Sequence, residues 1–193
     1  LELLEEKGDE IFSQADTLVL EVDLDKDLVK KALELCRTHG VRIVGLVSNM
    51  NIAAKRRDFL QQFDCFICNQ QEAGLLFLDD YTGIAPLQMQ DILAEKVLRA
   101  KFPLMVVTMG ADGAVYADIH GNKGYCPARN VQVKDTTGAG DAFCAGVSIG
   151  LTYGKTTAES IEIGSMLAAS VITSSENVCP RFLPEELGLN MTS

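Results

Sequence analysis

Short runs of apolar, often β-branched residues recur along the first half of the chain, and each is followed by a segment with apolar residues at helical spacing. The runs that predict strands are residues 17–22, 41–48, 64–68 and 103–109. The segments that predict helices are residues 25–40, 53–63, 69–77 and 86–102. Strands that alternate with helices are typical of a parallel sheet with helices on both faces. The pattern therefore predicts an α/β fold.

The rhythm changes in the second half of the chain. Residues 113–128 contain two short apolar runs around a His-Gly-Asn turn, which predicts a β-hairpin. A further short strand is expected at residues 131–135, and helices are expected at residues 138–150 and 157–173. No internal repeat, low-complexity segment or linker interrupts the sequence, so residues 1–193 are predicted to form one domain.

Composition limits the classes of protein to which this chain can belong. Of its 193 residues 47% are hydrophobic, which argues against disorder and is enough for a sizeable core. The chain carries 17 basic and 27 acidic residues, a formal charge of −10, which argues against binding to nucleic acid or to a membrane surface. No apolar run reaches the roughly 18 residues of a membrane span, and the acidic N-terminus lacks the basic start of a signal peptide. We therefore expect a cytoplasmic protein.

The six cysteines do not have the spacing of a metal site or of a disulfide framework. Cys65 and Cys68 form a C-x-x-C, but they fall in a predicted strand, where positions i and i+3 point to opposite faces. No second C-x-x-C and no nearby histidine completes a zinc set. We expect reduced, buried thiols.

The densest chemical pattern is DTTGAGD, residues 135–141, just before an apolar run that predicts a buried helix. Gly138, Ala139, Gly140 and Asp141 should form the start of that helix, where the first amides lack intrahelical acceptors and the helix dipole is positive. Small residues let a phosphate approach such amides closely. A carboxylate beside the phosphate could accept a proton from an attacking hydroxyl, so the turn is a candidate site of phosphoryl transfer.

Other phosphate-binding patterns are absent from the sequence. It contains no G-x-x-x-x-G-K-[ST], and no predicted strand is followed by G-x-G-x-x-G and a downstream acid, which disfavours a dinucleotide-dependent dehydrogenase. Judged alone, the glycine turn could also be an ordinary tight turn with Asp141 as a capping residue.

The segment DTTGAGDAFCAGVS, residues 135–148, resembles the C-terminal signature of the PfkB, or ribokinase-like, family of carbohydrate and nucleoside kinases. NQQEAGLLF resembles the family's N-x-x-E motif, with Asn69 and Glu72. VVTMGADGAVYA resembles its nucleotide-site strand and turn, with Thr108, Gly110 and Gly113. The resemblance covers most of the chain. It implies a ribokinase-like three-layer sandwich and transfer of a phosphoryl group from ATP, with Mg²⁺, to a hydroxyl of a sugar or nucleoside.

The resemblance also implies roles for the residues of the glycine turn. Asp141 would be the catalytic base, and the amides of Gly138, Ala139 and Gly140 would form the anion hole. Asp135 would either help to bind a monovalent cation such as K⁺ or serve only as a turn residue.

The other two motifs follow predicted strands, so they should lie at the carboxyl edge of the parallel sheet, where such folds bind ligands. The carboxylate of Glu72 could hold Mg²⁺-bound water near the ATP phosphates, or it could only cap its own helix next to Asn69. For the segment from Thr108 through Gly110 to Gly113, the alternative to nucleotide binding is an ordinary strand-to-hairpin turn.

Chains of this family are longer, and the resemblance implies that their N-terminal part holds a Gly-Gly motif, a small β-sheet lid and most contacts to the acceptor. This sequence contains no Gly-Gly pair and no lid-like meander. We therefore expect a fold that is incomplete at the N-terminus and lacks the lid, and a fragment that is inactive by itself. The alternative is a non-catalytic nucleotide-binding or regulatory module derived from such a kinase.

Two segments favour pseudouridine over ribose or a hexose as the acceptor. VSNMNIAAKR, residues 47–56, resembles a segment of the family's pseudouridine kinases, and residues 174–182 lie in a stretch that resembles their ending. Asn49, Asn51 and Lys55 are candidate polar contacts, or they are only solvated loop residues. The alternative is generic drift in a sugar kinase. The sequence leaves open whether the protein forms a homodimer.

Overall fold

The computed structural model describes residues 1–174 and 182–189. These residues pack into two compact units, Leu1–Gly110 with Ala114–Tyr125, and Ala111–Gly113 with the residues from Cys126 onward. The single domain expected from the sequence stays a prediction.

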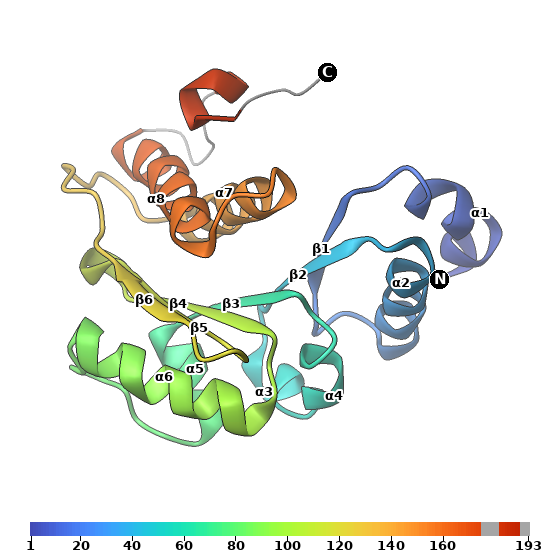
Figure 1. Cartoon of the computed structure of the whole chain (residues 1–193), viewed down its shortest axis with the longest axis horizontal. Coiled ribbons are helices and arrows are strands. Elements are labelled where there is room, and N and C mark those ends of the chain that lie inside the picture. The colour runs from blue at the N-terminus through green and yellow to red at the C-terminus, as the bar shows by residue number, and fades with distance from the viewer. Residues whose placement is uncertain (175–181, 190–193) are drawn as a thin grey trace. The chain divides into compact units, whose positions relative to one another are not determined.

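The first unit is built on a six-stranded sheet in which the spatial order of the strands follows the chain (Figure 1). The strands are β1 (Thr17–Glu21), β2 (Arg42–Leu46), β3 (Cys65–Asn69), β4 (Leu104–Thr108), β5 (Ala114–Asp118) and β6 (Lys123–Cys126). Strands β1 to β4 are parallel to one another, and β5 is antiparallel to β4. The mostly parallel sheet and the terminal hairpin that the sequence predicts are both confirmed.

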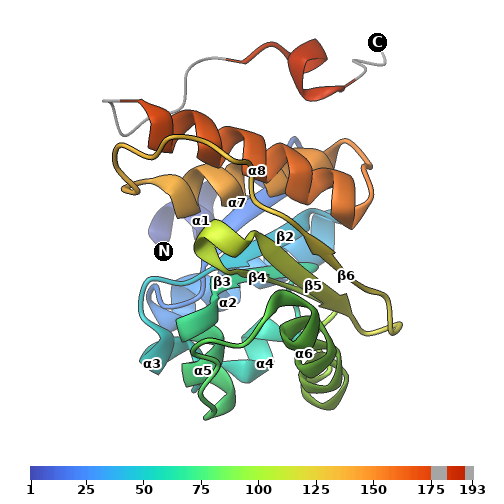
Figure 2. The same ribbon diagram turned by 90° about the vertical axis from the view of Figure 1, so that its left-hand side faces the viewer.

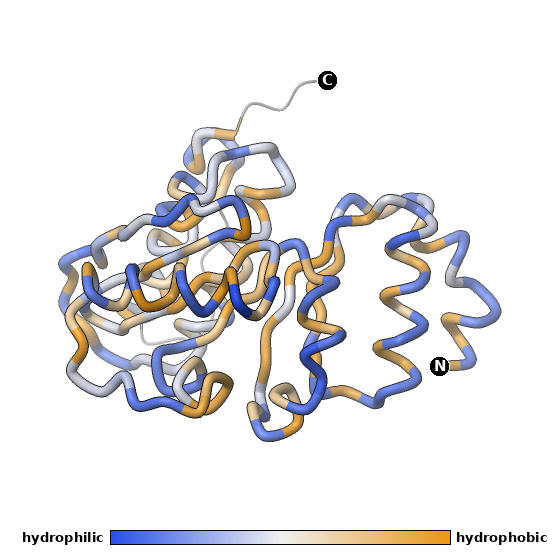
Figure 3. Tube along the Cα trace, turned by 60° about the horizontal axis from the view of Figure 1, so that its bottom comes forward, coloured by the Kyte–Doolittle hydropathy of each residue, from blue (hydrophilic) through white to orange (hydrophobic). Residues whose placement is uncertain are grey.

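Helices of the first unit place apolar residues in one core that includes one face of the sheet (Figure 2). The helices are α1 (Glu2–Phe12), α2 (Lys26–His39), α3 (Met50–Ala53), α4 (Arg57–Leu60), α5 (Gln70–Phe77) and α6 (Pro86–Ala100). In α6, where hydrophobic and hydrophilic residues alternate (Figure 3), Met89, Leu93 and Val97 recur every four residues and are fully buried. They share the core with Phe66 and Met105 of the sheet.

The opposite face of the sheet is apolar as well. Val44, Ile67 and Val106 alternate along their strands with residues of this core. Strands that are apolar on both faces are typical of a parallel sheet that is covered by helices on both sides.

The ends of α2 follow the local signals in the sequence. The Oδ1 atom of Asp25 accepts hydrogen bonds from the amides of Asp27 (3.0 Å) and Leu28 (3.1 Å). Gly40 ends the helix in the left-handed conformation, with φ +69°, which a residue without a Cβ adopts most readily. Both boundaries are as predicted.

The single helix predicted after the second strand is wrong, because the structure has two short helices there, α3 and α4. Arg56 separates them with φ −120° and ψ 39°, outside the helical region. Its Nη1 atom donates to the carbonyl oxygens of Val22 (2.7 Å) and Leu24. Both carbonyls follow β1, so a tertiary contact that local spacing does not reveal interrupts the helix.

The second unit is dominated by two helices that lie side by side, α7 (Ala139–Thr152) and α8 (Thr157–Thr173) (Figure 2). A Cβ atom built on Gly146 would lie 2.6 Å from the Cα of Gly164, and one on Gly164 would lie 2.7 Å from the carbonyl oxygen of Phe143. A real Cβ does not approach other atoms so closely, so the two backbones are in direct contact. This contact requires glycine at both positions.

The strand predicted at residues 131–135 is also wrong, because these residues have no strand conformation. The amides of Lys134 and Asp135 donate instead to the carbonyl oxygen of Ile172, at 2.8 and 3.4 Å. Ile172 belongs to the last turn of α8, where carbonyl groups have no intrahelical donor. The amides of Lys134 and Asp135 therefore bond to the end of a helix, whereas the apolar pattern predicted that they would bond within a sheet.

The prediction of buried thiols is confirmed for the five described cysteines, all of which are buried, while Cys179 lies outside the described residues. Burial raises the pKa of the Cys36 and Cys144 thiols to about 11, so both are protonated at neutral pH. In residues 1–174 and 182–189, no helix is long and apolar enough to cross a bilayer.

The glycine contact between α7 and α8 makes a prediction about stability. Gly146→Ala places a methyl group against the backbone of Gly164 and forces the helices apart. We expect the free energy of unfolding to fall by about 1–3 kcal/mol, the range for an overpacked core, as measured by denaturant unfolding followed by circular dichroism.

The matched control is Ala145→Leu, which adds a larger side chain at an exposed position of the same helix. Its free energy of unfolding should stay within about 0.5 kcal/mol of the parent chain. Equal unfolding midpoints for Gly146→Ala and the parent chain would contradict the tight contact.

Candidate functional site

The parallel strands of the first unit present their last residues along one edge of the sheet. Asn69 ends β3, Thr108 ends β4, and the two are direct register partners in the parallel pair. At the other side of the sheet, Glu21 ends β1 as the register partner of Leu46 at the end of β2. The carboxyl edge of a parallel sheet is where such folds bind ligands. The structure thus brings Asn69 and Thr108 together there, as predicted.

The N-x-x-E motif forms a capping box at the start of α5. The Oδ1 atom of Asn69 accepts from the amide of Glu72 at 2.8 Å, and the Oε2 atom of Glu72 accepts from the amide of Asn69 at 2.8 Å. Each side chain satisfies an amide at the helix start. The capping role that the sequence left open for Glu72 is therefore present, and it fixes the carboxylate at the carboxyl edge of the sheet.

The two glycines after β4 are in different surroundings. Gly110 has φ +59° and is exposed, and a Cβ atom on it would meet no atom within 4 Å. Gly113 has φ +99° and is buried, and a Cβ atom on it would lie 2.2 Å from the carbonyl oxygen of Cys126. Gly113 is thus required by close backbone packing, whereas Gly110 leaves room for a ligand.

The glycine turn leads directly into α7. Gly138 is the N-cap residue with φ +78°, and the amide of Ala139 donates to the carbonyl oxygen of Thr136 at 3.2 Å. A Cβ atom on Gly140 would meet nothing within 4 Å, so an anion can reach this turn of backbone. Asp141 is the third helical residue and is exposed. The helix start that the sequence predicts is confirmed, with one residue of difference at its boundary.

Asp135 is bonded to the turn that it precedes. Its Oδ1 atom accepts from the amide of Thr137 at 2.9 Å and from the Oγ1 hydroxyl of the same residue at 2.8 Å. These hydrogen bonds to Thr137 lower the pKa of the Asp135 carboxyl, because they stabilise the carboxylate. The structure shows the turn role for Asp135 that the sequence left open beside cation binding.

Sequence reasoning missed two acids at the carboxyl edge. Glu21 is the last residue of β1, and its Oε1 atom accepts from the Oγ hydroxyl of Ser48 at 3.1 Å. Asp23 follows it, and its Oδ1 atom accepts from the amide of Ser48 at 3.2 Å. The signal was an acid at the end of a predicted parallel strand, which is a position that faces ligands in such folds.

The role in acceptor recognition that was predicted for three polar residues after β2 stays a prediction. Asn49, Asn51 and Lys55 are exposed, in or next to α3, which follows β2 toward the carboxyl edge. Most of the second segment used in that prediction, residues 175–181, lies outside the described residues.

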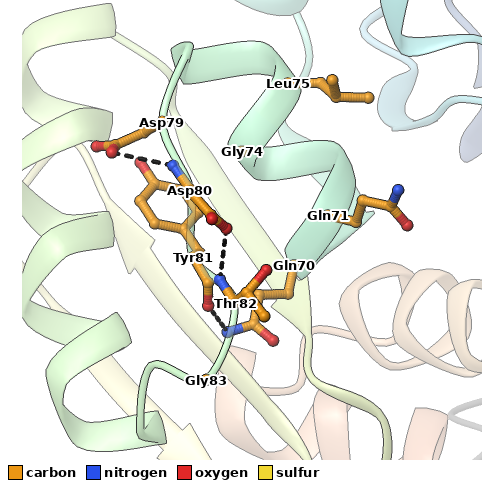
Figure 4. A pocket seen from close by; sticks show the side chains of 9 residues that line it. All are labelled: Gln70, Gln71, Gly74, Leu75, Asp79, Asp80, Tyr81, Thr82 and Gly83. Carbon is orange, nitrogen blue, oxygen red and sulfur yellow. Dashed lines mark hydrogen bonds between the residues drawn. The ribbon is translucent and has the colours of Figure 1, made fainter.

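A cavity of about 430 Å³ lies between α5 and the loop that follows it (Figure 4). It is lined by Asp79 and Asp80, and none of the site residues predicted from the sequence lines it. The pKa of Asp79 is lowered by its hydrogen bond with Lys96, and that of Asp80 by the amide of Thr82, so both stay ionised. Two carboxylates repel a phosphate, so this cavity is a poor place for a nucleotide.

A dedicated metal cage is absent from the described part of the chain, which has no group of three or more His, Cys, Asp or Glu residues that could hold an ion.

Comparison with known proteins supports the resemblance. The chain is 32% identical over 165 residues to a guanosine-inosine kinase of Exiguobacterium acetylicum, which covers 84% of this chain and 53% of that protein. It is 25% identical to a ribokinase of Schizosaccharomyces pombe, over 83% of this chain and 50% of that protein. The chain thus spans about half the length of the curated relatives that it matches.

Solved structures of ribokinase-like proteins have a similar fold. The structure of Arabidopsis thaliana ribokinase in complex with ribose and ATP matches with a TM-score of 0.77 at 20% identity, over 89% of this chain and 54% of that one. This match shows that the α/β fold is ribokinase-like, as predicted. The model of the pfkB family carbohydrate kinases matches residues 2–180, which is nearly the whole sequence. The chain therefore belongs to the pfkB family of carbohydrate kinases.

Proposed function

We propose that the full-length protein is an ATP-dependent phosphotransferase that moves the γ-phosphoryl group of ATP to a hydroxyl of a sugar or nucleoside. One observation carries the proposal: an accessible glycine turn begins α7 and places an exposed carboxylate, Asp141, on its first turn. Family membership and the sugar and nucleoside kinases among its relatives support it.

Asp141 has the position of a general base. Asp141 is the third residue of α7, near the unpaired amides and the positive end of the helix dipole, where acidic side chains are favoured. In the proposed reaction it accepts the proton of the acceptor hydroxyl while that oxygen forms a bond to the γ-phosphorus. The bond between this phosphorus and the bridging oxygen breaks, and ADP leaves with the electron pair.

We propose that the turn of Gly138, Ala139 and Gly140 stabilises the charge on the phosphoryl group during transfer. The amides of Gly138 and Gly140 would do so, because the amide of Ala139 already donates to the carbonyl oxygen of Thr136 at 3.2 Å. Gly140 is exposed and a Cβ atom on it would meet no atom within 4 Å, so the backbone is open to a ligand on that side. Preorganised amides act without reorganising during the reaction, which is why such anion holes contribute strongly to catalysis.

Within the first unit, three predicted site residues are suited to Mg-ATP. Glu72 holds a carboxylate at the carboxyl edge beside Asn69, while Thr108 and Gly110 offer a hydroxyl and an open backbone turn. We propose that Glu72 orients water on Mg²⁺, an ion that would supply charge neutralisation on the ATP phosphates. Gly113, which belongs to the second unit, acts by packing, because a Cβ atom there would overlap with the backbone at Cys126.

A nucleoside is the acceptor that we propose, and pseudouridine in particular. The guanosine-inosine kinase among the relatives supports the nucleoside class. Within the chain, the exposed Asn49, Asn51 and Lys55 could pair with the polar edge of a base. The carboxylate of Glu21 lies at the same edge of the sheet and could accept hydrogen bonds from ribose hydroxyls.

The role of Asp141 is tested in the full-length protein by Asp141→Asn. We expect turnover to fall by a factor of about 10² to 10⁴, the range for loss of a general base, with little change in ATP affinity. Asp27→Asn is the matched control, because Asp27 is also an exposed acid in the first turn of a helix. Steady-state kinetics and calorimetric ATP binding measure both quantities. Near-normal turnover of Asp141→Asn would remove it from this role, and ATP binding without turnover in the parent protein would favour a non-catalytic module.

The two roles of Glu72 are separated by Glu72→Gln and Glu72→Ala. Glutamine can still accept the Asn69 amide in a capping box, so we expect stability to be kept, whereas alanine should lower the free energy of unfolding by about 1 kcal/mol. Both variants lose the charge, so both should need more Mg²⁺ for half-maximal turnover. A normal Mg²⁺ dependence of Glu72→Gln would leave Glu72 with the capping role alone.

The chain offers a matched control for this pair. Glu159 closes a second capping box with Thr156 at the start of α8. Glu159→Ala should therefore reduce stability like Glu72→Ala but leave the Mg²⁺ dependence of turnover unchanged.

The acceptor is tested by comparing kcat/KM for pseudouridine, guanosine, inosine, ribose and fructose in the full-length protein. We expect nucleosides to exceed the free sugars by about tenfold or more, because a site that pairs with a base rejects substrates lacking it. Pseudouridine should lead. A higher value for guanosine would keep the nucleoside class and overturn pseudouridine, and a tenfold preference for ribose or fructose would overturn both.

A further inference from the structure

The segment that leads into α7, residues 134–138, is held at both ends by the helices of the second unit. At its start, the amides of Lys134 and Asp135 donate to the carbonyl oxygen of Ile172 in the last turn of α8. At its end, Gly138 is the N-cap of α7, whose backbone contacts α8 through the glycine pair described above. These two contacts leave only the conformation of residues 136 and 137 unset.

The carboxylate of Asp135 sets the shape of that remaining turn. Its Oδ1 atom accepts from both the amide and the hydroxyl of Thr137, at 2.9 and 2.8 Å. This arrangement is an Asx-turn, in which a side chain replaces a backbone acceptor. It holds Thr137 immediately before Gly138, the residue that turns with φ +78° into the helix.

We propose that Asp135 is a positioning residue, whose carboxylate, acting through Thr137, fixes the glycine turn in the shape that presents its amides to the transferring phosphoryl group. The inference rests on the proposed function. It differs from cation binding, because it requires a hydrogen-bond acceptor at Oδ1 and no negative charge. Displacing an anion hole by about 1 Å can reduce turnover by about 10²-fold, so a residue that never touches the substrate can matter this much.

The pair Asp135→Asn and Asp135→Ala tests this role in the full-length protein. Asparagine keeps the Oδ1 acceptor of an Asx-turn, so we expect its kcat to stay within about threefold of the parent. Alanine removes the acceptor, and kcat should fall by about 10- to 100-fold while KM for the acceptor changes little. Similarly, Thr137→Ser should keep activity, and Thr137→Val should lose part of it.

Hydrogen exchange of the Thr137 amide supplies a readout that does not depend on activity. Exchange should be faster in Asp135→Ala than in the parent and close to the parent in Asp135→Asn. The matched control is Asp118→Ala, since Asp118 holds a similar turn in the β5–β6 hairpin through the amides of His120 and Asn122. This control should speed exchange in the hairpin and leave kcat unchanged.

The remaining outcomes overturn the proposal in distinguishable ways. If Asp135→Asn loses as much turnover as Asp135→Ala and needs more K⁺, the charge of Asp135 acts on a cation. If Asp135→Ala keeps normal kcat and normal exchange at Thr137, the carboxylate does not hold the turn. If the parent protein phosphorylates no acceptor, the proposed function fails, while exchange at Thr137 still shows whether Asp135 shapes the turn.

Discussion

The direct backbone contact between α7 and α8 is the constraint on which the second unit depends. Gly146 and Gly164 let the two helices approach until a single methyl group would overlap with the neighbouring backbone. Because protein interiors are close-packed, such a contact leaves little freedom in the relative position of the two helices. The start of α7 carries Asp141, and the end of α8 holds the segment before it through Ile172. The packing of the helix pair therefore positions the two ends of the glycine turn.

A second principle is that the motif residues satisfy one another. Asn69 and Glu72 cap α5 reciprocally, and Asp135 bonds to Thr137 two residues later. Polar side chains that are bonded in this way keep their positions without a ligand, because each already has a partner. Such preorganisation is what electrostatic catalysis requires, since groups that are already oriented need not rearrange as charge develops. The same residues can thus serve both the fold and the chemistry.

The two glycines after β4 show that residues of one motif can be required for different structural reasons. Gly113 is packed against the backbone at Cys126, whereas Gly110 is open. A sequence pattern reports only that both are glycine, and it assigns them a common role. The surroundings divide that role into a packing function and space for a ligand.

Much of the fold could be predicted from local patterns. Apart from the strand expected at residues 131–135, the predicted strands, the long helices, the hairpin and the caps at Asp25 and Gly40 appear where apolar periodicity and capping residues indicated them. The helix start at Gly138 to Asp141 was also predictable, because glycine, small residues and an acid have a direct physical effect on a helix terminus. These features depend on residues close together in the chain, and a sequence records such neighbours fully.

What only the tertiary structure decided depends on contacts between distant residues. Arg56 breaks a predicted helix because it reaches carbonyl groups after β1, and residues 131–135 are no strand because Ile172 accepts two of their amides. The hydrogen bond that Glu21 accepts from Ser48, 27 residues away, likewise has no local pattern. The sequence by itself determined the chemistry of the family's motifs and the order of the elements. The tertiary structure decided which carbonyls and carboxylates the donors of those elements meet, because hydrogen-bond partners far apart in the chain leave no local pattern.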